Sequence, residues 1–254
     1  MSVKDLGLTT VTVRALLSHG DDSNGRADAV AHRLSQAIRL GLLLDGEQLP
    51  PESKLAEQMG VSTVTLREAL AALRQQGLVV TRRGRGGGTF VRAPEDLVRE
   101  LVQKLRQFST QALRDLGDHR GAISGMAAKL AAERAQADEV QSLARQVERL
   151  GAARTTSERR RADTQFNIEV AAAAQSPRLT AEELRLRTEV GDLLWLQLDD
   201  ADHEESVNAR RDLVAAIRQR RPAEARELAE RHVAIDTQRL LQLRLQVYEM
   251  ERER

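Results

Sequence analysis

The sequence predicts a mainly α-helical protein in which three helices and a β-hairpin precede an all-α bundle. Aromatic residues make up only 2% of the chain, too few for a β-sandwich or barrel, whereas the abundant Ala, Leu, Arg, Glu and Gln favour helices. Only residues 78–83 and 89–92 have the β-branched character of strands. A length of 254 residues with 41% hydrophobic residues is enough for two folded domains.

Composition also excludes several classes of protein. The chain has no cysteine, so disulfides, thiolate nucleophiles, zinc fingers and iron–sulfur clusters are ruled out. No apolar run exceeds five residues, which is too short for a membrane span or a secretory signal. We therefore expect a cytoplasmic protein without a membrane partner.

Turn-forming residues divide the chain into three predicted regions. Residues 1–25 end in a Gly-Asp-Asp-Ser-Asn-Gly cluster and are expected to form a flexible leader. A small domain follows over residues 26–93. An Ala-Pro-Glu-Asp segment at 93–96 then interrupts the periodic pattern. This break places a second, helical domain over residues 94–254.

Three helices are predicted in the small domain, at 26–41, 51–60 and 62–77. Pro51 suits the first turn of the second helix, and Ser62 is a good N-cap for the third. Only the tight turn Gly60-Val61 separates these two helices, which is the arrangement of a helix-turn-helix. The buried stripe of the third helix is expected to contain Leu66, Ala69, Leu70 and Leu73.

A basic patch is hidden inside a chain whose net charge is only +1. Residues 67–92 contain six arginines and a single acid, Glu68. The tip of the hairpin, residues 84–88, is glycine-rich, basic and expected to be flexible, so its backbone and arginines can approach a DNA groove. The tip lacks the Lys-Ser/Thr of a P-loop and the third glycine of the dinucleotide fingerprint. The helix-turn-helix, the hairpin that follows it as a wing, and the basic patch together predict DNA binding.

The second domain is expected to contain helices near 95–108, 111–135, 138–151, 156–175, 180–199, 204–220 and 223–250. Four of these helices place a polar residue on or beside an apolar stripe, for example His232 in the stripe Ala225, Leu228, His232 and Ile235. Unpaired buried charge is costly, so these polar groups are expected to meet one another, a ligand, or both. The predicted effector-binding residues are Arg120, Asp163, Asn167, Arg210 and His232.

Residues 26–93 contain a series of short motifs: Leu-Pro-Pro-Glu at 49–52, Gly-Val-Ser at 60–62, Leu-Arg-Glu-Ala-Leu at 66–70 and Gly-Arg-Gly-Gly-Gly-Thr-Phe-Val at 84–91. With these motifs, the segment resembles the winged helix of the GntR transcription regulators. Two positions depart from the family: Ser53 and Thr63 stand where relatives commonly have arginine. Because arginine reads bases in the operator, the operator sequence of the relatives does not carry over to this chain. The predicted DNA-binding residues are Ser53, Ser62, Thr63, Val64, Thr65, Arg67, Arg82, Arg83, Gly84 and Arg85.

A GntR winged helix followed only by helices resembles the FadR subfamily, which has an all-α FCD effector domain. In that family an Asp and three His bind a divalent metal, and the matching positions here are Asp163, Asn167, Arg210 and His232. Asn is a weak ligand and Arg cannot ligate at all. We therefore expect no metal and no other cofactor, with Arg210 supplying the positive charge and Arg120 assisting it. Asp163 and His232 leave weak divalent-metal binding open.

The sequence thus predicts a homodimeric transcription regulator, with repression the expected mode. Its partners would be double-stranded DNA, read as an inverted repeat, and a small organic acid or acyl-type effector. One alternative is an architectural DNA-binding protein without an effector. An enzyme is the third class, but no nucleophile elbow, His-Glu-x-x-His motif or di-iron Glu-x-x-His pair occurs in the sequence.

Overall fold

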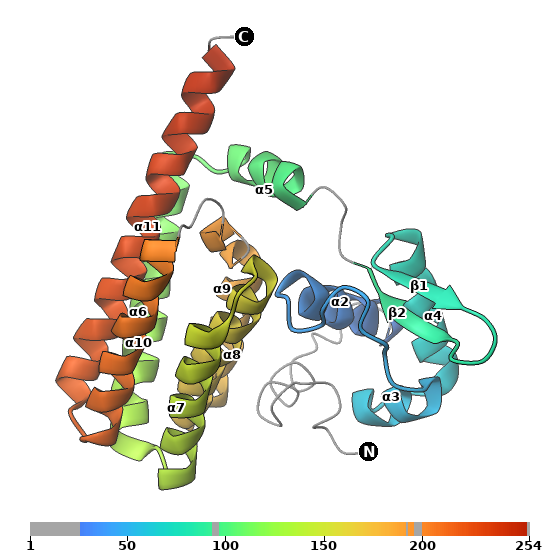
Figure 1. The fold of residues 1–254 in the computed structure, drawn as a ribbon, viewed down its shortest axis with the longest axis horizontal. Helices are drawn as coiled ribbons and strands as arrows, with labels where there is room; N and C mark the ends of the chain where they lie inside the picture. Colours follow the sequence, from blue (N-terminus) through green and yellow to red (C-terminus); the bar gives the residue numbers. More distant parts are fainter. Residues whose placement is uncertain (1–25, 93–96, 192, 196–199, 253–254) are drawn as a thin grey trace. The chain divides into compact units, whose positions relative to one another are not determined.

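The computed structural model describes residues 26–92, 97–191, 193–195 and 200–252. The chain divides into two compact units, Met1–Glu95 and Asp96–Arg254 (Figure 1). The predicted leader, residues 1–25, and the predicted break at 93–96 lie outside the described residues. No helix in the described part of the chain is long and apolar enough to cross a lipid bilayer.

The first unit has the predicted three helices and β-hairpin. Its elements are α2 (Arg26–Arg39), α3 (Glu52–Met59), α4 (Thr63–Gln75), β1 (Val79–Arg82) and β2 (Gly88–Val91). The two strands are antiparallel, with Val79 opposite Val91. The turn after α3 requires Gly60, whose φ of 67° lies in the left-handed region that glycine adopts without strain. The unit is therefore a helix-turn-helix followed by a wing.

Helix α4 buries one face and exposes the other. Leu66, Leu70 and Leu73 are almost completely buried, as the sequence predicts. The Ser62 side chain caps the helix by accepting a hydrogen bond from the Thr65 amide at 3.1 Å. The cap determines where α4 begins, and the buried stripe determines which residues face away from the unit.

The second unit is an all-α bundle in which α6 and α11 pack closely along one another (Figure 1). Two glycines of α6 allow this approach: an added Cβ would lie 2.5 Å from Thr237 Cγ2 at Gly117 and 2.6 Å from Glu230 Cγ at Gly125. The described helices are α5 (Leu97–Arg106), α6 (Thr110–Arg134), α7 (Ala137–Ala152), α8 (Thr156–Ala173), α9 (Pro177–Val190), the 3₁₀ turn η2 (Leu193–Trp195), α10 (Asp200–Arg218) and α11 (Pro222–Arg252).

The predicted helix at 180–199 is wrong at both ends. Helix α9 begins at Pro177, because proline has no amide hydrogen and is well accommodated in the first turn. It ends at Val190, where Gly191 weakens the helix, and a 3₁₀ turn follows at 193–195. Helix α10 then begins at Asp200 rather than at 204. The other helices of this unit lie within a few residues of the predicted ranges.

Arg220 closes the C-terminal end of α6, and its loss is expected to destabilise the bundle. Its guanidinium donates to the carbonyl oxygens of Glu133 at 2.7 Å and Ala135 at 2.8 Å, groups that otherwise lack partners at a helix end. Arg220→Ala should lower the free energy of unfolding by about 2 kcal/mol in urea titrations. The matched control is Arg221→Ala, which removes an exposed pair with Glu224 and should cost less than about 0.5 kcal/mol. Equal effects of the two variants would contradict this role.

Candidate functional site

The first turn of α4 is a solvent-facing surface. Thr63 and Val64 are exposed, Val64 by 61%, while Thr65 is half-buried. The Ser62 hydroxyl is shared between the Thr65 amide and its Oγ1, at 3.1 and 2.9 Å. The N-terminal turn of a helix offers unpaired N–H groups to phosphates. The predicted DNA-binding residues 62–65 therefore lie together at this end of the helix.

Arg67 extends from the exposed face of α4 and has a partner that sequence reasoning missed. Its Nε donates to Oε2 of Glu52, the first residue of α3, at 2.7 Å. Ser53 is exposed one residue further along α3. Because α3 and α4 pack together, the predicted Arg67 and Ser53 both belong to the exposed side of the helix-turn-helix.

The wing exposes the predicted arginines around a hydrogen-bonded turn. Arg82, Arg83 and Arg85 are all exposed, and the Arg82 guanidinium lies over the Phe90 ring at 4.6 Å. Gly84 has a φ of 95°, and its carbonyl accepts a hydrogen bond from the amide of Gly87 at 2.8 Å. An added Cβ at Gly87 would lie 2.6 Å from the Arg82 carbonyl oxygen. Glycine is thus required at the tip for conformation and for space.

In the helical unit, Asp163 of α8 lies between two buried arginines. Its Oδ1 accepts from Arg210 Nη2, and its Oδ2 accepts from Arg187 Nη1 at 2.8 Å. Asn167, one turn along α8, donates to Oδ1 at 3.0 Å. Arg187 in turn donates from Nε to Glu183 at 3.0 Å. Helices α8, α9 and α10 are therefore joined by one buried network of charges.

The network continues to α11 and α6. Arg210 Nη2 lies 2.9 Å from His232 Nε2, and that nitrogen is 3.8 Å from Asp236 Oδ2. Arg120 donates to the same Asp236 oxygen at 3.0 Å. The three arginines are thus matched by three carboxylates, Asp163, Glu183 and Asp236. Because positive and negative groups are equal in number and paired, their attraction offsets most of the free energy that burying each charge costs.

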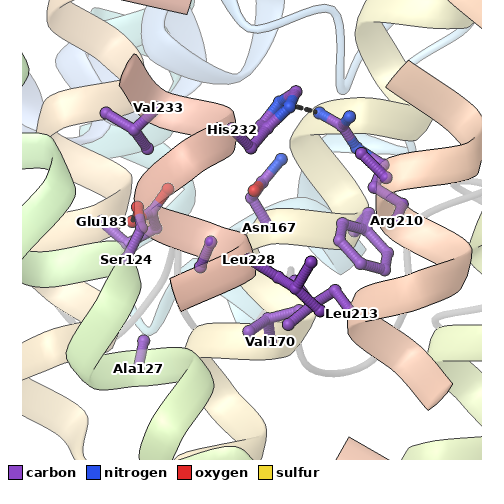
Figure 2. A pocket seen from close by; sticks show the side chains of 13 residues that line it. Ser124, Ala127, Asn167, Val170, Glu183, Arg210, Leu213, Leu228, His232 and Val233 are labelled. Carbon is purple, nitrogen blue, oxygen red and sulfur yellow. Dashed lines mark hydrogen bonds between the residues drawn. The ribbon is translucent and has the colours of Figure 1, made fainter. Parts of the chain in front are cut away.

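A small pocket, partly open to solvent, lies beside this network. Figure 2 shows Arg210 and His232 on one side and Ser124 with Glu183 on another. Of the predicted effector residues, Asn167, Arg210 and His232 line the cavity, but Asp163 and Arg120 do not. The expectation that Arg120 assists Arg210 is not met, because its guanidinium is turned to Asp236. Apolar walls come from Phe166, Val170, Leu213, Leu228 and Val233.

Three charged members of the network were missed from the sequence: Glu183, Arg187 and Asp236. Glu183 and Arg187 are spaced i and i+4 around the apolar Leu184 and Leu186, a signal that ordinary surface ion pairs share. Asp236 is spaced i+4 from His232, and it is buried where the predicted stripe used the half-buried Ile235 instead. A one-residue shift of the stripe would have found Asp236.

Burial and the charges of the network together shift the pKa values of Asp163 and His232 strongly. Burial would raise the pKa of Asp163, but Arg210 and Arg187 outweigh it and lower the pKa to about 2. Burial, reinforced by Arg210, lowers the pKa of His232 to about 4. At neutral pH, Asp163 is therefore ionised and His232 is neutral, so His232 can accept a hydrogen bond from Arg210.

Neutral His232 makes the bundle sensitive to mild acid. Its pKa is about 4 in the folded state and about 6.5 when unfolded, so the unfolded chain takes up the proton first as the pH falls. We expect about 3 kcal/mol of stability to be present above pH 6.5 and lost between pH 6.5 and 4. His232→Asn should remove this part of the pH dependence in urea titrations. The control His119→Asn, at an exposed site, should show the same dependence of stability on pH as the wild type. A His232→Asn protein with that same pH dependence would contradict the expectation.

The residues at the family's metal positions do not fit a metal ion. Arg210 Nη2 contacts both Asp163 and His232, so a guanidinium lies between the two remaining ligand positions. A guanidinium keeps its proton and cannot bind a metal. In the part of the chain that the structure describes, no group of three or more His, Cys, Asp or Glu side chains is arranged to hold one.

Known protein families match both units of the chain. The GntR family of bacterial regulatory proteins matches residues 26–91, and the FCD domain matches residues 115–235. The chain is 44% identical to the HTH-type transcriptional regulator RmpR of Mycobacterium gastri over 82% of this chain and 77% of that protein. It is 32% identical to the HTH-type transcriptional repressor NanR of Enterobacter sp. over 48% of each chain.

Among solved structures, Escherichia coli McbR/YncC is similar in fold, with a TM-score of 0.51 and 19% identity over 89% of this chain and 99% of that one. The structure has an exposed helix-turn-helix with a wing and a helical unit with a pocket. The two family matches cover these same two units. The chain belongs to the GntR family of transcriptional regulators and carries an FCD effector-binding domain.

Proposed function

We propose that this regulator is a homodimeric repressor that binds an inverted-repeat operator and is controlled by a small organic anion held at Arg210. Two-fold symmetric dimers place two recognition helices on two half-sites, which favours an inverted repeat. Repression is in line with the name of the relative NanR, a transcriptional repressor.

The observation that carries the effector proposal is the state of Arg210. This arginine is only 3% exposed, lines the cavity and has an Nε without a hydrogen-bond partner among the described residues. An unpaired buried donor is costly, so it favours a ligand that accepts a hydrogen bond. The apolar walls around Phe166 and Leu213 suit the hydrocarbon part of an organic acid.

Competition for Arg210 supplies a route for regulation. Its Nη2 is already bound to Asp163, so an entering carboxylate shares or replaces that contact. Asp163 is also bound to Arg187 of α9, and a change at Arg210 is therefore transmitted to another helix. The site then has two arrangements, with Arg210 bound to Asp163 or to the ligand. A ligand changes the operator affinity only to the extent that it binds one of the two more tightly than the other.

We further propose that the site works without a metal, with the Arg210 guanidinium in place of the cation between Asp163 and His232. Protein purified without chelator should contain no stoichiometric transition metal by elemental analysis. One tightly bound metal per chain would overturn this part of the proposal.

A thermal-shift screen with small mono- and dicarboxylates and acyl-CoAs tests the effector site. A true effector at about 100 times its dissociation constant should raise the melting temperature of the wild type by about 5–10 °C. Arg210→Ala should lose this shift. The control Arg211→Ala, at the exposed neighbouring arginine, should keep it, and the same ligand should change operator affinity in gel shifts.

The alternatives give different outcomes. An architectural DNA-binding protein would bind DNA but show no ligand-dependent shift with any of these acids. A ligand shift that survives Arg210→Ala would place the effector elsewhere. Wild-type protein that prefers no DNA sequence over competitor, at a stated salt concentration, would contradict operator binding itself.

A further inference from the structure

Glu52 holds the guanidinium of the recognition helix. The Nε of Arg67 donates to Oε2 of Glu52 at 2.7 Å, although the two side chains remain 66% and 38% exposed. The residues are 15 positions apart in the chain and come from α3 and α4. The contact is therefore made by the packing of the two helices and not by one helix alone.

This contact selects which edge of Arg67 is available to DNA. A guanidinium has five N–H donors in one plane. With Nε bound to a carboxylate, the outer edge formed by Nη1 and Nη2 is left for another partner. Two parallel donors match the O6 and N7 acceptors of guanine in the major groove. An arginine that is not held can turn to a phosphate instead, which adds affinity but no sequence information.

We propose that Glu52 is a positioning residue that orients Arg67 toward a guanine of the operator and so sets sequence specificity. The inference rests on the proposed operator binding. The simplest alternative is an exposed ion pair of no consequence, because many such pairs contribute little. The two readings differ in what they change. Removing a carboxylate near DNA strengthens binding to every sequence alike by charge, which leaves the ratio of operator to scrambled affinity unchanged. Loss of positioning lowers that ratio.

The experiment compares operator and scrambled DNA at one salt concentration, with the full chain and an operator selected from random DNA. The variants are Glu52→Ala, Glu52→Gln and Glu68→Ala. Glu68 is the matched control, because it is an exposed acid on α4 directly after Arg67. Glu52→Ala should lower the ratio of operator to scrambled affinity at least about tenfold without weakening binding to scrambled DNA. Glu52→Gln keeps a hydrogen-bond acceptor, so its ratio of operator to scrambled affinity should be intermediate. The ratio of Glu68→Ala should stay within about twofold of the wild-type ratio.

A second measurement reports on the guanine contact directly. Each operator guanine is replaced in turn by 7-deazaguanine, which lacks the N7 acceptor. The wild type should lose about five- to tenfold in affinity at one guanine per half-site. In Glu52→Ala and in Arg67→Ala, the same replacement should change affinity less than about twofold. A merely structural role for Glu52 would not alter this penalty.

Two results would overturn the inference. One is an unchanged ratio and an unchanged 7-deazaguanine penalty in Glu52→Ala. The other is an equal loss of operator and scrambled affinity together with a lower melting temperature, which would show a folding defect. These results differ from a failure of the proposed function, in which the wild type itself selects no operator.

Discussion

Arg187→Met should lower the free energy of unfolding by about 3–5 kcal/mol, one of the two largest effects expected for this chain. Arg187 is 2% exposed and donates to both Asp163 and Glu183. Among the described residues, its loss leaves the buried Glu183 with the Ser124 hydroxyl as its one hydrogen-bond partner. Removing one partner of a buried ion pair costs more than the pair contributes, because the remaining charge is uncompensated.

Two further variants separate charge from packing in this prediction. Arg185→Met removes an exposed arginine of the same helix that pairs with Glu182 and Glu189, and should cost less than about 1 kcal/mol. Arg187→Met/Glu183→Met removes the buried pair together, leaves Asp163 with Arg210, and should recover most of the lost stability. Urea titrations measure all three. An Arg187→Met protein within about 1 kcal/mol of wild type would refute the role assigned to this residue.

The double variant Asn167→His/Arg210→His should convert the site into a metal site. It removes the guanidinium from between Asp163 and His232 and restores the three histidines that the family resemblance implies. Without metal, the variant should be less stable than wild type, because Asp163 loses one of its two arginines. With Zn²⁺ or Ni²⁺ it should bind one ion per chain, and ligation of that kind contributes directly to the free energy of folding.

The readouts are elemental analysis and the melting temperature with metal or with chelator. The double variant should melt several degrees higher with Zn²⁺, by about 5 °C or more, and a further Asp163→Ala change should abolish the gain. The wild type should not respond. A wild type that responds equally would mean that Arg210 does not replace the cation.

The first unit was predictable from the sequence because its signals are local. Gly60, the Ser62 cap and the stripe through Leu66, Leu70 and Leu73 each act within a few residues. The wing follows from two β-branched runs around glycines. Predictions that depend on such neighbours are robust, and these elements begin and end within a few residues of the predicted positions.

The bundle was predictable in kind but not in its contacts. Periodicity placed Arg120, Arg210 and His232 on apolar stripes and Asp163 with Asn167 beside one. All of these are largely buried except Asn167, which is half-buried. Periodicity could not assign Arg120 to Asp236, a partner 116 residues away. It also carried one helix through Gly191 to residue 199, because apolar residues beyond 191 continue the helical pattern. In the structure, α9 ends at Val190 and residues 193–195 form a 3₁₀ turn.

The sequence by itself determined the fold class, the recognition helix with its wing, and the need for buried charges to be compensated, because helix periodicity, caps and turns are properties of neighbouring residues. Only the tertiary structure decided which charge meets which: Arg210 with Asp163 and His232, Arg187 with Glu183, and Arg67 with Glu52. The direction of a long arginine side chain depends on the helices packed around it, and most of these partners come from a different helix.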